Sequence, residues 1–392
     1  MDPGSADRRW VGVGRSNAPN AADAALEAVG DALRGRPAEL VVLFASDVMD
    51  LRTLVDAAYT AGRHTPLIGC STAGEIATDG PGDAGVVAVA FGGPGFAIST
   101  TAVTGVGADA RAAGAEAAAC LGAVTGSEHR VLMLLTDGLA GDQQEIVRGA
   151  FGVAGAGVPL VGGCAGDNLK MTGTHQFHNG HVMSDAVVAA AIGSDAPLGI
   201  GVRHGWRAMG DGMLVTCSGD NRVVELDDQP ALDVYLDHLD VPAIARTDAD
   251  AFTRFALSHP LGMSRRASEE QVRFIAGADF EQRALLTMAR VPQGGVVWLM
   301  AGDDDSVLAA TDAACADALA PLDGVAPKGL LVFDCIARRG VLGDAGIDRE
   351  VARVDEHAGG APVAGFYTYG EIARTRGVSG FHNQTLVVLA VG

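Results

Sequence analysis

Short apolar runs alternate with stretches of helical periodicity along most of the chain. The first series consists of LVVLFASD (40–47), a helical stretch, PLIG (66–69) and VVAVAFGG (86–93). The same order returns twice, in VLMLLTD (131–137), VPLVGGCAGD (158–167) and VVAAAIG (187–193), and in LLVFD (330–334), APVAGFYTYGEI (361–372) and TLVVLAVG (385–392). Such runs predict buried strands. Their alternation with helices predicts an α/β fold with layered, mostly parallel or mixed sheets built from repeated β-α-β units.

The three stretches also share motif residues. GCSTAGEIA (69–77) and GFYTYGEIA (365–373) carry Gly, Thr, Gly, Glu, Ile and Ala at a constant offset of 296 positions. Gly166-Asp167 precedes FHN (177–179) by the same interval that separates Gly370-Glu371 from FHN (381–383). Self-similarity at fixed spacing indicates duplication of one α/β unit.

Each unit is preceded by one more predicted strand and helix. A strand at 10–14 leads into a helix near 20–34, and a strand at 96–103 leads into a helix near 108–124. For the third unit we expect the lead strand at 296–301, before a helix that begins at the acidic run 303–305. The region from about 205 to 290 departs from this pattern and predicts an inserted α+β segment. We therefore divide the chain into 1–204 and 205–392.

Composition and charge exclude several classes of partner. The chain of 392 residues carries 28 basic and 48 acidic residues, a net charge of -20. Because no stretch gathers Lys or Arg, we expect no nucleic acid and no anionic membrane as partner. No apolar run approaches the ~20 residues that span a bilayer, and the start lacks a secretion signal, so we expect a cytoplasmic protein. The six cysteines are scattered singly, which favours free thiols over a disulfide framework or a zinc site.

Acidic residues end the first strand of each unit, at Asp47, Asp137 and Asp334. Open α/β sheets bind ligands at the carboxyl ends of their strands, so these acids are candidate ligand contacts. The plainer alternative is that Asp47 and Asp137 cap the helices that follow. Asp142, three residues before Glu145, resembles the start of a capping box and competes with Asp137 for that role.

The turn PLIGCSTAGEI (66–76) combines hydrogen-bond donors with one carboxylate. Its glycines, Gly69 and Gly74, allow a sharp bend that exposes N–H groups, and Ser71 and Thr72 add hydroxyl donors. Glu75 supplies a negative charge beside them. Donors opposite a carboxylate suit a zwitterion such as an amino acid; the alternative is a purely structural turn. Acids in matched places, at Asp167 and Glu371, favour the ligand hypothesis.

Cysteines provide a second candidate chemistry. Cys70 and Cys164 follow Pro-Leu-Ile-Gly and Pro-Leu-Val-Gly-Gly, in what we take to be comparable positions. Two facing thiols could exchange an α-proton as in a cofactor-independent racemase, and one activated thiol could transfer an acyl group. No partner base is evident nearby, and small cysteines in glycine-rich turns more often serve packing.

Histidines provide a third candidate chemistry. Asn179-Gly180 is a strong signal for a type I′ hairpin, which would set His178 opposite His181. Facing imidazoles could hold a metal or a haem iron, with His204 as a further isolated candidate ligand; the alternative is a simple cross-strand pair. The chain contains no HExxH, P-loop, GxSxG or zinc-finger spacing.

The phrases GCSTAGEI, LVGGCAGD, RHGW, HPLG and FHNQTLVVLAVG, in this order along the chain, resemble the FIST family, named for F-box and intracellular signal transduction proteins. The resemblance covers nearly the whole chain, as a FIST N domain over 1–204 and a FIST C domain over 205–392. It implies a sensory module that binds small ligands, amino acids among them. Some members are described as haem proteins that sense nitric oxide through a partner kinase or cyclase. Carried over by motif, the resemblance points to Gly69, Cys70, Ser71, Thr72, Gly74, Glu75, Tyr367, Tyr369, Gly370 and Glu371.

Three functions follow, in order of preference. The first is a sensor that binds an amino acid-like metabolite between the Gly-Glu turns, without a cofactor, and relays binding to a separate partner such as a kinase or cyclase. The second is a haem-based nitric oxide sensor that uses His178, His181 or His204. The third is a cysteine-dependent racemase or acyl-transfer enzyme.

Overall fold

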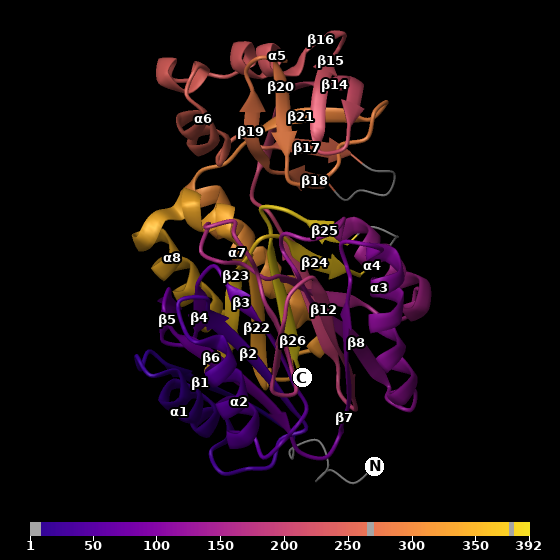
Figure 1. Ribbon diagram of the computed structural model, residues 1–392, viewed down its shortest axis with the longest axis vertical. Coiled ribbons are helices and arrows are strands. Elements are labelled where there is room, and N and C mark those ends of the chain that lie inside the picture. Colours follow the sequence, from indigo (N-terminus) through magenta and orange to yellow (C-terminus); the bar gives the residue numbers. More distant parts are fainter. Residues whose placement is uncertain (1–8, 265–269, 376–379) are drawn as a thin grey trace.

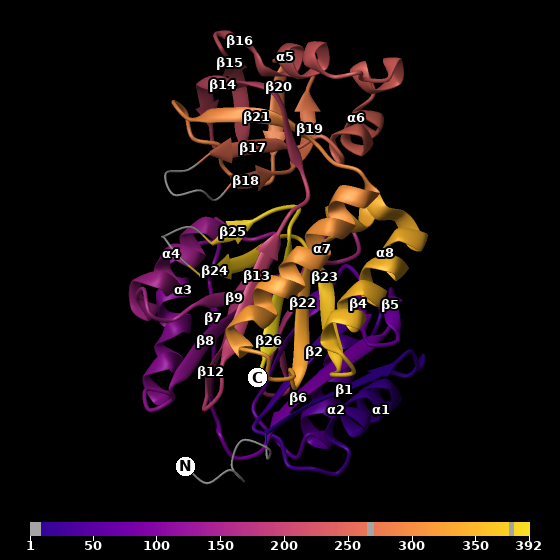
Figure 2. The same cartoon turned by 180° about the vertical axis from the view of Figure 1, so that it is seen from behind.

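The computed structural model describes residues 9–264, 270–375 and 380–392 (Figure 1). Three six-stranded mixed sheets form the body, and the helices lie outside them (Figure 2). Each sheet contains one parallel pair, and its other strands are antiparallel. The chain between β13 and α7 forms a separate module at one end of the body, which we call the cap (residues 205–303).

The sheets have the same order of strands. Sheet one runs β1 (Trp10–Ser16), β6 (Val86–Gly92), β2 (Leu40–Ser46), β3 (Leu67–Thr72), β10 (Gln176–His178), β11 (His181–Met183). Sheet two runs β7 (Phe96–Thr104), β12 (Ala186–Ser194), β8 (His129–Thr136), β9 (Leu160–Cys164), β24 (Glu371–Arg374), β25 (Phe381–His382). Sheet three runs β13 (Leu198–Arg203), β26 (Leu386–Val391), β22 (Gly329–Cys335), β23 (Val363–Thr368), β4 (Glu75–Ala77), β5 (Gly80–Gly82).

The duplication predicted from the sequence is therefore visible as three repeats, with one difference. The lead strand of the third repeat is β13, which pairs with the last strand, β26. The strand expected in that place, β21 (Val296–Ala301), pairs instead with β14 of the cap. Our assignment of the lead strand was wrong because a strand's own pattern does not reveal its partner. The cap is thus inserted between the lead strand of the third repeat and its helix α7.

Each repeat gives its hairpin to a neighbouring sheet. The β4–β5 hairpin of the first repeat pairs with β23 of the third, β24–β25 of the third pairs with β9 of the second, and β10–β11 of the second pairs with β3 of the first. The Asn179-Gly180 hairpin is confirmed, since His178 and His181 are direct partners. This cyclic exchange closes the three sheets into a ring.

The inner faces of the ring share one apolar core. Phe44, Phe333 and Phe366 come from sheets one and three, and the Phe44 and Phe366 ring centroids are 4.8 Å apart. Val131, Met133 and Leu135 of sheet two belong to the same core. Full burial of each such side chain contributes roughly 1.5–3 kcal/mol.

The outer faces are covered by helices, two for each repeat. They are α1 (Ala21–Leu33) and α2 (Leu51–Ala61); α3 (Ala110–Ala117), which continues as a 3-10 turn (Ala118–Ala123), and α4 (Gln143–Ala154); and α7 (Asp304–Leu319), followed by a 3-10 turn (Ala320–Leu322), and α8 (Ile336–Ala358). Asn20, Asp50, Asp109, Asp142 and Asp303 accept backbone N–H groups as N-caps.

The cap has its own core and sheet. Its strands run β18 (Glu270–Arg273), β17 (Leu261–Ser264), β21, β14 (Arg207–Gly219), β15 (Arg222–Leu226), β20 (Ala284–Thr287), β19 (Ile275–Asp279), and β16 (Gln229–Pro230) pairs with β15. Its helices are α5 (Ala231–His238), a 3-10 turn (Ala243–Arg246) and α6 (Ala249–Ala256). Tyr235 and Phe252 lie in a core that belongs to the cap alone. The inserted segment predicted near 205–290 therefore folds around its own centre.

Candidate ligand-binding site

The three Gly-containing turns interlock where the parallel strands end. The N–H of Ala73 donates to Tyr367 O at 3.0 Å, and the N–H of Tyr367 donates to Gly74 O at 2.8 Å. Cys164 and the turn at Tyr369–Gly370 exchange an equivalent pair of bonds. At the third junction the N–H of Gly166 donates to Ser71 O at 3.0 Å, and the Ser71 hydroxyl donates to Gly166 O at 2.8 Å. The N–H groups expected to meet a ligand are thus largely engaged in joining one repeat to the next.

The two turn glutamates are directed into the fold. The Glu75 carboxylate accepts Thr72 Oγ1 at 2.5 Å and the N–H of Gly85, which directly precedes β6, at 3.1 Å. Glu371 likewise accepts Thr368 Oγ1 at 2.5 Å and the N–H of Thr385, which directly precedes β26, at 3.1 Å. Burial raises the pKa of each carboxyl from 4.5 to about 7, against the opposing effect of these hydrogen bonds. Neither side chain lines any of the three cavities described below.

In the middle repeat a different acid accepts the N–H that directly precedes the closing strand. There Asp137 accepts the N–H of Asp185, which directly precedes β12, at 2.7 Å, and it also accepts Thr174 Oγ1 at 2.7 Å. Asp167 stands in the Gly-acid turn but is one methylene shorter than glutamate. Its carboxylate instead accepts hydrogen bonds from the loop that follows it. In the middle repeat the acid of the turn therefore does not bind the strand that closes the repeat, as the glutamates of the other two turns do.

Asp167 holds an unusual loop over residues 168–173. Its carboxylate accepts the N–H groups of Met171, Thr172 and Gly173 at 3.0, 2.7 and 3.1 Å, together with the Tyr369 hydroxyl. Burial would raise the pKa of Asp167, but the hydrogen bonds from Tyr369 and the loop outweigh it, and the pKa lies below its ordinary value. The loop is thus tied to an ionised carboxylate.

The same loop stores backbone strain and presents apolar side chains. Asn168, Leu169 and Met171 have φ values of 53°, 62° and 54°, each costing roughly 1–2 kcal/mol for a residue other than glycine. Leu169 is 61% exposed and Met171 is 50% exposed. Leu139, two residues after Asp137, is 38% exposed. Strain held by a buried acid and used to expose apolar side chains is typical of a binding loop.

A cavity of about 500 Å³ lies between this part of the ring and the cap. Its ring side is formed by the 138–143 segment at the start of α4, by Met171, and by the rings of Tyr369 and Phe381. Its cap side is formed by Asp220, Asn221 and the 287–290 segment. The N–H of Thr287 donates to Asn221 O at 2.8 Å, which fixes the two cap segments to each other. The volume is within the range of small-molecule sites.

Comparison with protein families supplies the context for this cavity. The FIST N domain model matches residues 39–229 and the FIST C domain model matches residues 231–374. The chain belongs to the FIST family. FIST domains are associated with sensory roles in signal transduction. Among curated proteins, none matches this chain.

In this FIST protein the cavity brings together only part of the predicted site. Tyr369 lines it, Asp167 and Asp137 support its two ring loops, and Cys164 accepts Thr136 Oγ1 at 3.2 Å behind Gln143. The other predicted contacts serve the fold: Ser71 Oγ donates to Gly166 O at 2.8 Å, and a Cβ at Gly69 would lie 2.2 Å from Leu43 O. Tyr367 is buried beneath Arg339.

The two cysteines of the FIST turns are not in matched positions, contrary to our sequence interpretation. Gly69 and Gly162 face equivalent residues of the neighbouring strands, and Cys70 follows Gly69 directly whereas Cys164 is two residues after Gly162. Because successive strand residues alternate between faces, the thiols enter different cores. Burial raises the pKa of Cys70 well above its ordinary value and that of Cys164 to about 12, so both are thiols rather than thiolates.

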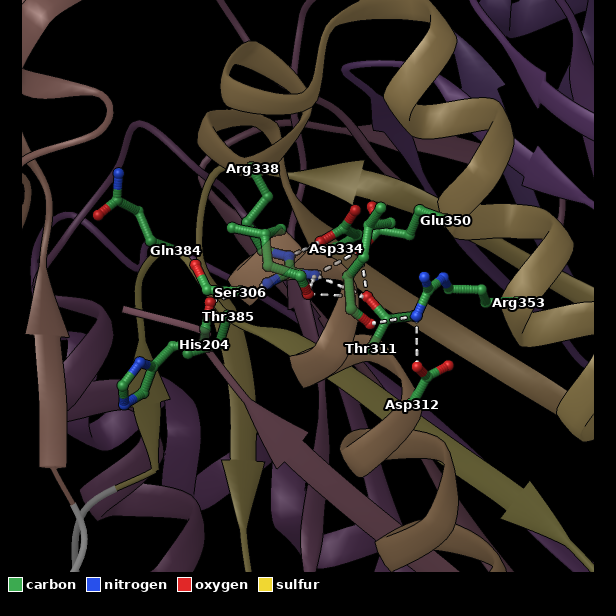
Figure 3. A network of polar contacts seen from close by, with 12 residues as sticks. His204, Ser306, Thr311, Asp312, Asp334, Arg338, Glu350, Arg353, Gln384 and Thr385 are labelled. Atoms are coloured by element: carbon green, nitrogen blue, oxygen red, sulfur yellow. Dashed lines mark hydrogen bonds and ion pairs between the residues drawn. The ribbon is translucent and has the colours of Figure 1, made fainter. Parts of the chain in front are cut away.

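The acids predicted at the strand ends have different roles in the structure and do not form one site. Asp50 and Asp142, rather than Asp47 and Asp137, cap α2 and α4. Asp334 lies within β22, where its carboxylate accepts Arg338 Nε at 2.8 Å. Figure 3 shows the contacts of Arg338 with Asp334 and Glu350, and the Arg338 side chain is fully buried. Arg338 also donates to His204 O at 2.9 Å and to Thr311 Oγ1 at 3.0 Å, and so joins the chain's exit into the cap to α7 and α8.

The candidate histidines do not form one site. His178 and His181 pair across the hairpin, and His178 Nε2 lies 3.1 Å from Thr100 Oγ1. His204 lies at the base of the cap, where its Nδ1 accepts the Trp206 N–H at 3.0 Å. Within residues 9–264, 270–375 and 380–392, no group of three or more His, Cys, Asp or Glu side chains is arranged to hold a metal ion.

Sequence reasoning missed the cap half of the cavity. Asn221, Thr287 and Arg290 carry no motif, and only the tertiary arrangement brings them to the ring. One signal was available for the ring half, because Asp167 replaces the glutamate of the other two turns. In the described part of this FIST chain, no helix is both long and apolar enough to cross a membrane.

Proposed function

We propose that this chain is a cytoplasmic sensory protein that binds an amino acid-like metabolite between the cap and the ring. The observation that carries the proposal is the strained 168–173 loop, held by Asp167 and Tyr369 at the mouth of the 500 Å³ cavity. In the first and third repeats the turn glutamates instead bind their own repeat. The strained loop lies in the repeat whose turn acid is an aspartate and which borders the cavity, and this supports a role in binding.

The chemistry of the lining supports a zwitterion with an apolar side chain. Arg290 on the cap supplies a cation for a carboxylate. Asp142 and Asp220 supply negative charge for an ammonium group, while Tyr369, Phe381 and Met288 supply apolar surface. In this proposal Glu75 and Glu371 fix the turns and do not contact the ligand.

The position of the cavity supports a way to transmit binding. A ligand there contacts both the ring and the cap, so it favours arrangements in which the two lie close together. In the part of the chain that the structure describes, the crossings between them lie near Gly205 and near Gly302, and Arg338 fixes the first crossing through His204 O. A separate partner, such as a kinase or cyclase, would read the position of the cap.

A calorimetric screen of the twenty amino acids tests this proposal. We expect at least one to bind, and Arg290→Gln to weaken it about tenfold or more because a charge-assisted bond is lost. Tyr369→Phe should also weaken it, since the hydroxyl positions the loop. Arg254→Gln, a matched charge change on exposed α6 of the cap, should have no effect. No binding across the panel, or equal loss in both arginine variants, would overturn the proposal.

Haem is a second candidate, at a different cavity. A cavity of about 1000 Å³ is lined by His204, Arg203 and Arg207 and by the apolar residues of β13. Burial, followed by the nearby Arg338 charge, lowers the pKa of His204 to about 4, so its imidazole is neutral, as a metal ligand must be. The apolar side chains of β13 fit the macrocycle, whereas Arg203 and Arg207 are paired with Asp317 and Asp303 and would have to exchange these partners for the haem carboxylates. Protein from haem-supplied cells should then show a Soret band that His204→Ala abolishes; colourless protein would exclude haem.

A further inference from the structure

The threefold repeat places equivalent grooves at two of the lead strands, β13 and β1. The haem-candidate cavity is lined by β13, by Thr375 after β24, and by Pro159 before β9. A second cavity of about 630 Å³ is lined by the corresponding elements one repeat on: β1, Thr78 after β4, and Pro362 before β23. At the third position His178 approaches Thr100 on β7 to 3.1 Å. We consider the groove at β1, which we call the β1 groove, because its chemistry is distinct.

The β1 groove is locally basic in an acidic protein. Arg15, Arg34 and Arg36 line it, against Asp31 and Asp79. Asp79 is already paired with Arg15 Nη1, at 3.2 Å. Two arginines and one aspartate therefore remain outside that pair.

Arg15 is held in a fixed position at the groove. Its Nη1 and Nη2 donate to Gly80 O at 3.2 Å and to Pro81 O at 3.0 Å, which fixes the guanidinium against strand β5 of the β4–β5 hairpin. The guanidinium therefore presents a fixed positive charge at the groove, to which an oxyanion is attracted.

The other two arginines and the strand edge complete an anion site. Arg36 stacks on Trp10, with its Cζ 3.8 Å from the ring centroid, and Arg34 follows the end of α1. Because β1 is the edge strand of its sheet, alternate N–H groups point outward along the groove. Planar guanidinium groups match the geometry of phosphate and carboxylate oxygens.

We propose that the β1 groove binds a small metabolite through an anionic head group, phosphate or carboxylate, independently of the cavity between cap and ring. The site lies on the first repeat and shares no lining residue with that cavity. Its occupant would contact the hairpin turn at Asp79, which belongs to the β4–β5 hairpin paired with sheet three.

Isothermal titration with phosphate, pyrophosphate and citrate tests the site and separates the two head groups. We expect saturable binding of at least one anion, weakened tenfold or more in the double variant Arg34→Gln/Arg36→Gln. Both side chains are exposed, so this variant should fold normally. The control Arg52→Gln/Arg254→Gln changes the net charge equally, on exposed positions of α2 and α6.

The outcomes are distinct. Binding of pyrophosphate but not citrate assigns a phosphorylated ligand, and the reverse assigns a carboxylate; both support the site. No saturable binding of any of the three anions, binding that survives Arg34→Gln/Arg36→Gln, or equal loss in the control variant would overturn it. Because the amino acid screen uses Arg290→Gln, failure here leaves that test unaffected.

Discussion

Glu371→Gln should change how stability depends on pH, in a direction that the structure fixes. The pKa of Glu371 rises from 4.5 to about 7, chiefly because the carboxyl is buried. The folded state therefore holds this proton more tightly than the unfolded state. Unfolding free energy then falls as pH rises from 4.5 through about 7. Glutamine does not titrate, and its amide can meet the Thr368 hydroxyl and the Thr385 N–H in the same place.

The magnitude follows from the difference in pKa. At about 1.36 kcal/mol per pKa unit, a rise from 4.5 to about 7 equals about 3.4 kcal/mol. With an unfolding entropy of about 2.1 cal/mol/K per residue over 392 residues, this corresponds to about 4 °C in Tm. The Tm of the variant should thus equal that of the wild type near pH 4, below the unfolded pKa, and exceed it by a few degrees near pH 8.

Thermal unfolding from about pH 4 to pH 8 measures this difference. Glu75→Gln should behave alike, since its pKa also rises to about 7, and the double variant should have nearly flat stability over this range. Asp167→Asn provides a control of opposite sign. The pKa of Asp167 is lowered, so its charge contributes stability at neutral pH that is lost only as the solution becomes acidic. Identical pH profiles for wild type and Glu371→Gln would refute the reasoning.

Three further predictions test the packing. Gly74→Ala should destabilise by about 2–4 kcal/mol in denaturant unfolding, because φ is 118° and the new Cβ would lie 2.8 Å from Gly82 O. Gly80→Ala, with φ 123° and open space, should show only the backbone part, about 1–2 kcal/mol, and equal costs would contradict the packing argument. A mild thiol reagent should label Cys217 alone among the six cysteines of the native protein, as read by peptide mass spectrometry; labelling of Cys70 or Cys164 would contradict their burial. Arg338→Leu should cost about 3–5 kcal/mol in the same unfolding assay, because Asp334 and Glu350 lose their buried partner, and a neutral effect would mean that these acids are already uncharged.

The repeats and their strands could be predicted from the sequence because both rest on local patterns. Apolar runs mark β2, β8 and β22, and Asn179-Gly180 marks a hairpin whichever strand lies beside it. The exchange of hairpins between repeats leaves no such local trace. From the sequence, Gly74 and Glu75 could equally bind a ligand or connect one repeat to the next. Only the hydrogen bonds to Tyr367 and Gly85 show that they connect strands within the fold.

The candidate site could be predicted only in part, for a related reason. Tyr369 and Asp167 lie in recognisable turns, but Arg290 reaches them through the insertion of the cap after β13. The insertion also explains the wrong lead strand. β21 has the right pattern and precedes the right helix, yet its neighbour is β14. Long-range pairing of this kind depends on the whole fold rather than on any segment.

Hydrogen–deuterium exchange with and without the bound amino acid tests the central claim most directly. At a ligand concentration of about 100 Kd, binding adds about 2.7 kcal/mol to the states that hold it. We predict slower exchange in three segments, 138–143, 168–173 and 287–290, which line or border the cavity between cap and ring. The 73–85 segment, which carries the Glu75 turn, should be unchanged. Protection confined to that turn, with no effect on the cap, would contradict the account.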